Sequence, residues 1–134
     1  MVLHNLIGTS ILVVEDDYML ACDLAGALAA HGSEIVGPFP DLANGLDALD
    51  NADVDAAVID VRLRDERVFP LADRLWRSNV PFIIITGYQI RDIPDRFDDI
   101  RLMVKPVDTA EMALALATSV GEHRSGILTE EPGI

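Results

Sequence analysis

Cysteine is almost absent from this chain of 134 residues, which contains Cys22 alone. A single cysteine excludes an internal disulfide and suits a reducing compartment. Lysine and arginine are also scarce, at 10 residues against 23 aspartates and glutamates, which gives a formal net charge of -13. This excess of negative charge argues against direct binding of nucleic acid or of an anionic membrane surface, because both are polyanions. It is compatible with a bound divalent cation or a basic protein partner.

Long apolar runs are lacking as well. The longest, such as Val80 to Ile85, are far shorter than the roughly 20 residues that a membrane-spanning helix needs. No basic region precedes an apolar stretch at the N-terminus and no small-residue cleavage site follows, so we expect a protein that stays in the cytoplasm. Half of the residues are hydrophobic, which indicates one packed domain rather than a disordered chain.

Short apolar runs alternate with longer helical patterns along the chain. The runs have the length and β-branched content of buried strands and lie at residues 11–14, 34–37, 56–59, 82–85 and 102–104. The helical patterns lie at residues 18–31, 41–51, 67–78 and 108–120, with Asp17, Asp41 and Asp108 as candidate N-caps. We expect Trp76 to serve packing. The fourth crossover, residues 89–99, is short, charged and interrupted by Pro94, so any helix there should be short or mobile.

The alternation of strands and helices predicts an α/β fold with a doubly wound, five-stranded parallel sheet. Its expected strand order is the flavodoxin-like 2-1-3-4-5. We place this domain at residues 9–121 and expect a loosely ordered tail at residues 122–134, which is polar and has a Pro-Gly pair near its end. In such sheets ligands bind beyond the carboxyl ends of the strands.

Chemically active side chains stand at the carboxyl ends of four expected strands. They are Glu15 and Asp16 after the first, Asp60 at the third, Thr86 at the fourth and Lys105 at the fifth. These ends meet at one edge, so we expect an acidic pocket that suits Mg²⁺, to which the backbone carbonyl of Arg62 would add an oxygen. A carboxylate beside such an ion can attack a phosphoryl group, whose oxygens a hydroxyl and an ammonium group can bind.

The segments ILVVEDD, AAVID, ITG and VKP, in this order, resemble the receiver domain of two-component response regulators over residues 9–121. The resemblance implies that a histidine kinase or phosphotransfer protein phosphorylates Asp60. It also assigns Mg²⁺ binding to the acid pair and phosphoryl contacts to the hydroxyl and the lysine, here Glu15, Asp16, Thr86 and Lys105.

The segments PFIIITGY, at residues 81–88, and RVFPLADRL, at residues 67–75, resemble a narrower group of stand-alone receivers. That group has a Pro-Phe-x-Phe-Ala-Thr-Gly-Tyr signature, from which this sequence departs at Ile84 and Ile85. Receivers of this group are often associated with alphaproteobacterial kinases.

Two further positions depart from the usual receiver pattern. Receivers typically carry a switch aromatic three residues before the lysine, where this chain has Leu102, and Tyr88 is the candidate replacement. Arg62 stands two residues after the acceptor aspartate, where many receivers have a residue that influences the access of water. Its side chain would either screen the phosphoryl group or compete with Mg²⁺ for the pocket.

We therefore expect a single-domain response regulator that is not an enzyme and that signals through protein contact with a downstream target. The last helix offers a candidate partner or homodimer face. The main alternative is a degenerate receiver that binds partners without phosphorylation. A phosphatase with an aspartyl nucleophile would need an acid in place of Arg62, and a flavin-binding electron carrier would need a hydroxyl-rich loop where Glu15 and Asp16 stand.

Overall fold

Five runs of aliphatic residues form the parallel sheet at the centre of the protein, and in three of these strands almost every residue is buried. The computed structural model describes residues 5–87 and 93–129. The strands of the sheet are β1 (Ser10–Val14), β2 (Glu34–Phe39), β3 (Ala56–Asp60), β6 (Phe82–Thr86) and β7 (Arg101–Val104). They pair in the order β2-β1-β3-β6-β7, and every pair is parallel. The predicted doubly wound order 2-1-3-4-5 is confirmed.

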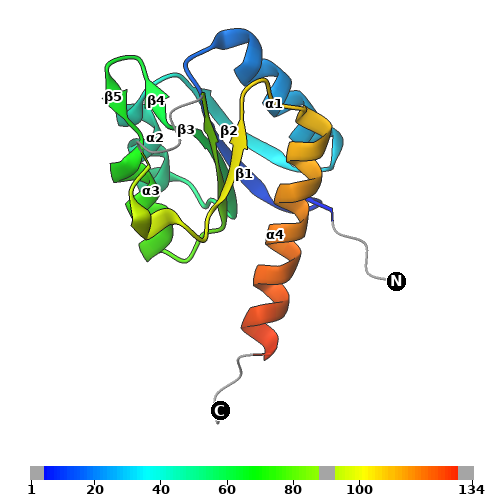
Figure 1. Cartoon of the computed structure of the whole chain (residues 1–134). Coiled ribbons are helices and arrows are strands. Elements are labelled where there is room, and N and C mark those ends of the chain that lie inside the picture. Colours follow the sequence, from blue (N-terminus) through cyan, green and yellow to red (C-terminus); the bar gives the residue numbers. More distant parts are fainter. Residues whose placement is uncertain (1–4, 88–92, 130–134) are drawn as a thin grey trace.

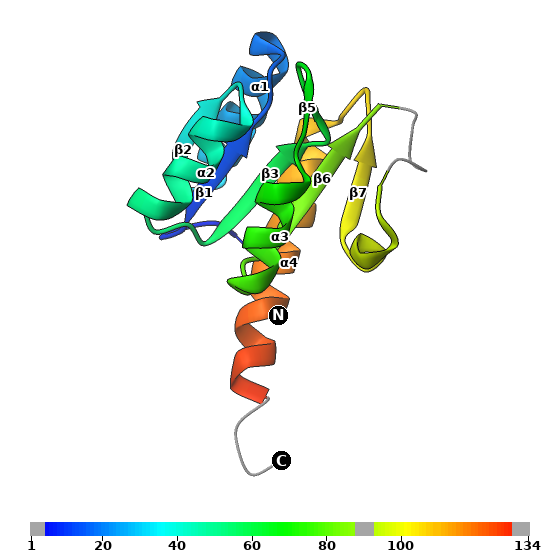
Figure 2. The same ribbon diagram turned by 90° about the vertical axis from the view of Figure 1, so that its left-hand side faces the viewer.

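Helices cover both faces of the sheet (Figures 1 and 2). On one face lie α1 (Tyr18–Ala30) and α4 (Thr109–Thr129), and on the other lie α2 (Leu42–Asn51) and α3 (Phe69–Arg77). Alternate residues of each strand belong to the two cores, so that Val13 packs with the first pair of helices and Leu12 with the second. Because each fully buried large aliphatic side chain contributes about 1.5–3 kcal/mol, these two cores fix the sheet on which the site is built.

The helix starts follow the expected capping chemistry. The carboxylates of Asp17, Asp41 and Asp108 each accept a hydrogen bond from the backbone N–H three residues later, at 3.2, 2.8 and 3.0 Å. Each bond satisfies one of the free donors of a first helical turn. Beyond the end of α1, Gly32 has a φ of 99°, which a glycine adopts without a steric penalty. All three predicted N-caps are confirmed.

A small antiparallel hairpin follows β3 where no strand was expected. It consists of β4 (Arg62–Leu63) and β5 (Glu66–Arg67), and it delays the start of α3 to Phe69, so the helix expected from residue 67 begins later. The local pattern is that of a strand, because Arg62 is exposed between the buried Val61 and Leu63. The turn contains no glycine to mark it, and Arg64 itself takes the left-handed conformation with a φ of 57°.

Helix α4 continues to Thr129, which corrects the expectation of a loosely ordered tail from residue 122. No proline lies between residues 109 and 129, and extending an existing helix by one residue costs little compared with starting it. The end of α4 projects beyond the sheet in Figure 1. Residues 130–134 of the expected tail lie outside the described residues, and the expected domain boundary at residue 121 stays a prediction.

The crossover between β6 and β7 contains, in its described part, the short 3-10 helix η2 (Asp95–Phe97). A short helix at this place was predicted from the charge and the proline of the segment. Residues 88–92 of the crossover lie outside the described residues. The expected mobility of residues 89–99 stays a prediction.

The end of this crossover is anchored to α3 by two side chains. Phe97 is 1% exposed, stacks on Phe69 at a ring-centroid distance of 5.9 Å and meets the edge of Phe82 at 6.4 Å. Arg96 donates to both oxygens of Asp73, at 2.8 and 3.1 Å, and its guanidinium lies 4.7 Å from the centre of the Phe97 ring. The residues that replace a fourth helix are therefore packed against the α2 and α3 side of the sheet.

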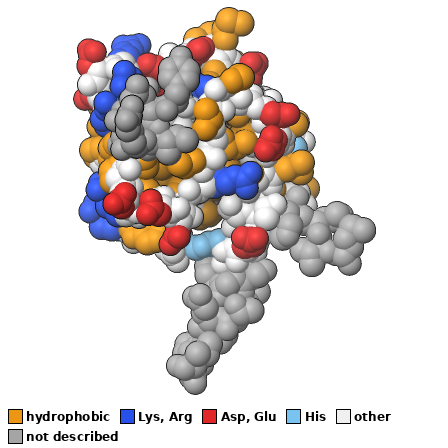
Figure 3. All heavy atoms as spheres, viewed as in Figure 1, with side chains coloured by type: hydrophobic (Ala, Val, Ile, Leu, Met, Phe, Trp, Pro, Cys, Tyr) orange, Lys and Arg blue, Asp and Glu red, His pale blue; other side chains and the backbone are white. Residues whose placement is uncertain are grey.

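The surface carries several apolar side chains. Figure 3 shows apolar groups across the middle of the face that carries β7 and α4, with acidic groups around them. Val104 of β7 and Leu114 of α4 are 46% and 57% exposed. Trp76, which we expected to serve packing, is 56% exposed, because it lies one position after the buried Leu75 on α3 and is rotated about 100° from it around the helix axis. Among the described residues, no helix is both long enough and apolar enough to cross a bilayer.

Candidate functional site

The carboxyl edge of the sheet brings together the side chains that the sequence singled out. β3 lies between β1 and β6, so its last residue, Asp60, is central in the sheet. Thr86 is the last residue of β6, and the remaining side chains follow directly after β1 and β7, namely Glu15, Asp16 and Lys105. The topology of the sheet therefore makes neighbours of residues that are up to 90 positions apart.

Three carboxylates form one cluster at this edge. Glu15, Asp16 and Asp60 each place an oxygen within 4.8 Å of the other two. Glu15 is 2% exposed and Asp60 is 4% exposed, whereas Asp16 is half-buried. Ionised groups of one sign that are held this close and this deep are costly unless cations compensate them. The cluster therefore requires positive charge.

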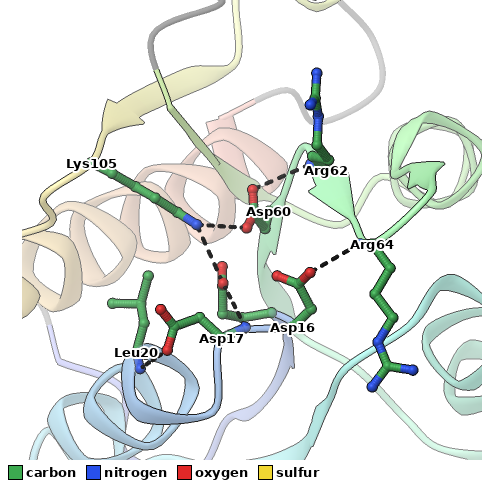
Figure 4. Close-up of polar contacts among 8 residues, drawn as sticks. Asp16, Asp17, Leu20, Asp60, Arg62, Arg64 and Lys105 are labelled. Atoms are coloured by element: carbon green, nitrogen blue, oxygen red, sulfur yellow. Dashed lines mark hydrogen bonds and ion pairs between the residues drawn. The ribbon is translucent and has the colours of Figure 1, made fainter.

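Lys105 supplies part of that charge. Its Nζ donates to Asp60 Oδ2 at 2.8 Å and to Glu15 Oε1 at 3.3 Å (Figure 4). Burial lowers the pKa of Lys105, but the hydrogen bond and the charge of Asp60, with the charge of Glu15, raise it by more. The net pKa lies above the ordinary value, so the side chain stays charged at neutral pH.

Glu15 remains incompletely compensated. Burial, together with the hydrogen bond and the negative charge of Asp60, raises the pKa of Glu15 to about 8. The backbone N–H of Asp17, at 3.0 Å from Glu15 Oε1, and the charge of Lys105 oppose this shift without cancelling it. The second oxygen, Oε2, is buried and has no hydrogen-bond partner. A buried oxygen of this kind is a free ligand position.

The three successive acids after β1 serve three different purposes. Glu15 faces Lys105, Asp16 accepts the backbone N–H of Arg64 at 2.9 Å, and Asp17 caps α1 (Figure 4). Glu15 and Asp16 thus both belong to the carboxylate cluster, whereas Asp17 is directed to the first turn of the helix. Asp17 takes the capping role that the sequence favoured over a role in metal binding.

The donor set fits Mg²⁺. Mg²⁺ is a hard cation that prefers carboxylates and water, and it usually takes few protein ligands. Three convergent carboxylates and an unpartnered buried oxygen on Glu15 meet those requirements. Glu15, Asp16 and Asp60 would hold the ion, while the backbone carbonyl of Arg62 stays a predicted fourth ligand.

The side chain of Arg62 does not compete for this pocket in the structure. Its backbone N–H donates to Asp60 Oδ1 at 3.3 Å, and its guanidinium is exposed and points away from the carboxylates (Figure 4). The alternative in which the Arg62 side chain competes with Mg²⁺ for the pocket therefore does not agree with the structure. Its influence on the phosphoryl group stays a prediction.

Three further residues were predicted to take part in the site or in its switch, namely Thr86, Leu102 and Tyr88. Thr86 is 2% exposed and its backbone carbonyl accepts the N–H of Lys105 at 2.8 Å, which ties the lysine to the end of β6. The role of its hydroxyl stays a prediction. Leu102, in the place of the usual aromatic, is half-buried against the α2 and α3 core. Tyr88, its candidate replacement, lies outside the described residues.

The sequence did not reveal that the β4–β5 hairpin contacts the site. Arg64, in the turn of that hairpin, hydrogen-bonds Asp16 across 48 positions of sequence. The alternation of apolar and charged residues from Val61 to Leu63 was compatible with a strand. The contact with Asp16, however, is made by a backbone N–H, which nearly every residue type carries, so the sequence could not indicate it. Such a contact is visible only once the turn has been placed.

Solved structures that resemble this chain include response regulator receiver proteins. The solution structure of SdrG from Sphingomonas melonis Fr1 matches with a TM-score of 0.70 and 33% identity, over 82% of this chain and 96% of that chain. A response regulator receiver protein from Sinorhizobium medicae WSM419 matches with a TM-score of 0.73 and 21% identity, over 86% and 96%. No protein-family model matches the sequence.

Curated sequences give a weaker match of the same kind. The transcriptional regulatory protein PdtaR of Mycobacterium tuberculosis is 26% identical over 121 residues. The alignment covers 85% of this chain, which spans 58% of the length of that relative. With the parallel sheet and its strand order, these matches show that the chain has the fold of response regulator receiver domains.

Proposed function

We propose that this chain is a Mg²⁺-dependent receiver that accepts a phosphoryl group on Asp60 from a histidine kinase or a histidine phosphotransfer protein. One observation carries the proposal. Lys105 Nζ lies 2.8 Å from Asp60 Oδ2, inside a cluster of three carboxylates in which one buried oxygen has no partner. The cluster thus joins a nucleophilic carboxylate, a fixed cation and ligands for a second cation.

The chemistry follows from these positions. A carboxylate oxygen of Asp60 attacks the phosphorus, the bond between phosphorus and the donor imidazole nitrogen breaks, and its electron pair returns to the imidazole. Lys105 shifts its hydrogen bond from Asp60 to a phosphoryl oxygen, and the hydroxyl of Thr86 donates to another. Glu15, Asp16 and Asp60 would hold Mg²⁺, which would supply positive charge for the transferred oxygens.

The direct test is phosphorylation by a small phosphodonor. Acetyl phosphate with Mg²⁺ should add one phosphoryl group to the intact protein, as measured by mass spectrometry. The adduct should be absent with EDTA and in Asp60→Asn, and present in the matched control Asp53→Asn, whose carboxylate is exposed just ahead of β3. A protein that binds partners but never takes up phosphate would instead be the degenerate receiver that is the main alternative.

We extend the proposal to signalling. A receiver with a net charge of -13 is suited to act through protein contact with a downstream target rather than on nucleic acid, and its single cysteine suits the cytoplasm. The apolar face with Val104 and Leu114 is the candidate contact or homodimer surface. A stand-alone role without enzymatic turnover, and membership of the group with the Pro-Phe-x-Phe-Ala-Thr-Gly-Tyr signature, are parts of this proposal that await their own tests.

A further inference from the structure

The backbone of the β4–β5 hairpin reaches into the candidate Mg²⁺ site. Arg64 N donates to Asp16 Oδ2 at 2.9 Å (Figure 4). Arg64 occupies the turn of the hairpin with a φ of 57°, a left-handed conformation that residues other than glycine rarely adopt. The chain thus keeps a disfavoured backbone conformation at the residue whose N–H contacts Asp16.

The hairpin is a firm support for this contact. Leu63 is 1% exposed and belongs to the core beneath α2 and α3. The N–H of Val68 donates to the carbonyl of Val61 at 2.9 Å and closes the base of the hairpin. At the same base, Arg62 N donates to Asp60 Oδ1 at 3.3 Å. The position of the turn is therefore set by packing and by hydrogen bonds that do not involve Asp16.

Asp16 depends on this support more than its neighbours do. Glu15 and Asp60 are both held by Lys105 and are deeply buried. Asp16 is half-buried, and within residues 5–87 and 93–129 the hydrogen bond to its carboxylate comes from Arg64 alone. A half-buried carboxylate without such a bond is free to rotate toward solvent.

We infer that Arg64 is a positioning residue for the Mg²⁺ site, and that it acts through its backbone N–H rather than through its charge. The inference rests on the proposed function, because it concerns a ligand of the proposed metal. The N–H fixes the rotation of the Asp16 carboxylate in the orientation in which one of its oxygens joins those of Glu15 and Asp60. Outer contacts of this kind orient metal ligands and raise metal affinity.

The sharpest test removes the N–H and leaves the side chain in place. Semisynthesis that replaces the peptide bond before Arg64 with an ester should weaken Mg²⁺ binding about 10–100-fold in calorimetric titration. The matched control is an ester before Leu20, whose N–H donates to the Asp17 carboxylate at 3.2 Å. That change removes the same kind of bond one residue away from the ligand, and it should leave Mg²⁺ affinity unchanged.

Ordinary variants give an independent comparison. Arg64→Gly and Arg64→Val lose the same charge, but glycine accepts a positive φ and valine, a β-branched residue, strongly disfavours it. The glycine variant should bind Mg²⁺ like the unchanged protein, while the valine variant should bind more weakly. Equal weakening in both variants would assign the effect to the guanidinium and overturn the inference.

The outcomes distinguish failure of the inferred role of Arg64 from failure of the proposed Mg²⁺ site. Failure of the unchanged protein to bind Mg²⁺ in the titration would remove the proposed metal site itself. Binding by the unchanged protein, with equal affinity in the ester variant at residue 64, would leave the metal site standing and overturn the role of Arg64. Thermal unfolding of each variant verifies that it is folded before titration.

Discussion

The ammonium group of Lys105 lies 2.8 Å from the carboxylate of Asp60, although Asp60 ends β3 and Lys105 follows β7, 45 positions later in the chain. The same group lies 3.3 Å from Glu15. One cation therefore compensates two buried acids, and under the proposed function the same cation would bind the phosphoryl group on Asp60. Stability and chemistry are thus linked at this edge.

Replacing Lys105 with methionine should destabilise the metal-free protein. Two buried acids would lose their cation, and because the lysine side chain is itself 33% exposed, we expect a loss of about 1–3 kcal/mol in the free energy of unfolding. Urea denaturation in EDTA measures it. The exposed Arg77→Met should cost less than about 0.5 kcal/mol. A Lys105→Met variant as stable as the unchanged protein would contradict the assigned role of the lysine.

The stability of the metal-free protein should fall as the pH rises from about 4.5 to about 8. The pKa of Glu15 is about 8 in the folded protein against an ordinary value of 4.5. Between these values the folded state holds the proton more tightly than the unfolded state does, so raising the pH favours unfolding. Denaturation in EDTA at several pH values measures this contribution.

Two controls identify Glu15 as the source of this pH dependence. Glu15→Gln removes the ionisation and should remove its part of the slope. Mg²⁺ at saturating concentration should flatten the slope in the unchanged protein, because the ion compensates the carboxylate. A slope that is the same in Glu15→Gln as in the unchanged protein would refute the assignment.

Asp16 and Asp17 are adjacent but should respond oppositely to substitution. Asp17→Ala removes the N-cap of α1 and should lower the free energy of unfolding by about 1 kcal/mol without weakening Mg²⁺ binding. Asp17→Asn, which caps almost as well, should restore most of the stability. Asp16→Ala should instead weaken Mg²⁺ binding with little loss of stability. Calorimetric titration measures Mg²⁺ affinity and urea denaturation measures stability in the three variants. Loss of Mg²⁺ affinity in Asp17→Ala together with loss of stability in Asp16→Ala would contradict the assigned roles of metal binding for Asp16 and capping for Asp17.

Phe97 should be a major source of stability in the crossover between β6 and β7. It is 1% exposed and contacts Phe69 and Phe82, so Phe97→Ala should cost about 3–5 kcal/mol in the free energy of unfolding. Trp76→Ala provides the comparison on an aromatic residue that is 56% exposed, and it should cost less than about 1 kcal/mol. Similar losses in both variants would mean that the crossover is not anchored as the packing indicates.

Much of this architecture was predictable because it depends on patterns of residue type. Buried parallel strands need continuous aliphatic runs, and helix starts need capping side chains. Both signals are strong here, as Asp41 at the start of α2 illustrates. The convergence of the acids and Lys105 then follows from topology alone, since parallel strands share one carboxyl edge. A sequence therefore indicates which residues meet.

The parts that could not be predicted depend on backbone geometry. The β4–β5 hairpin turns at Arg64 without a glycine, so its positive φ has no signature in the sequence. The extent of α4 to Thr129 reflects low-cost helix propagation through polar residues that equally suit a tail. The exposure of Trp76 depends on which side of α3 meets the sheet, and a shift of one position along a helix rotates a side chain by about 100°, which is enough to move it from the core to the surface.

The most direct measurement of the central claim locates the phosphoryl group on the chain. After acetyl phosphate treatment, borohydride reduction converts a phosphorylated aspartate to homoserine, which peptide sequencing by mass spectrometry assigns to a residue. We expect homoserine at position 60 alone, in amounts that depend on Mg²⁺ and that fall sharply in Lys105→Met. Homoserine at another aspartate, or none at position 60 with Mg²⁺ present, would contradict the account of this site.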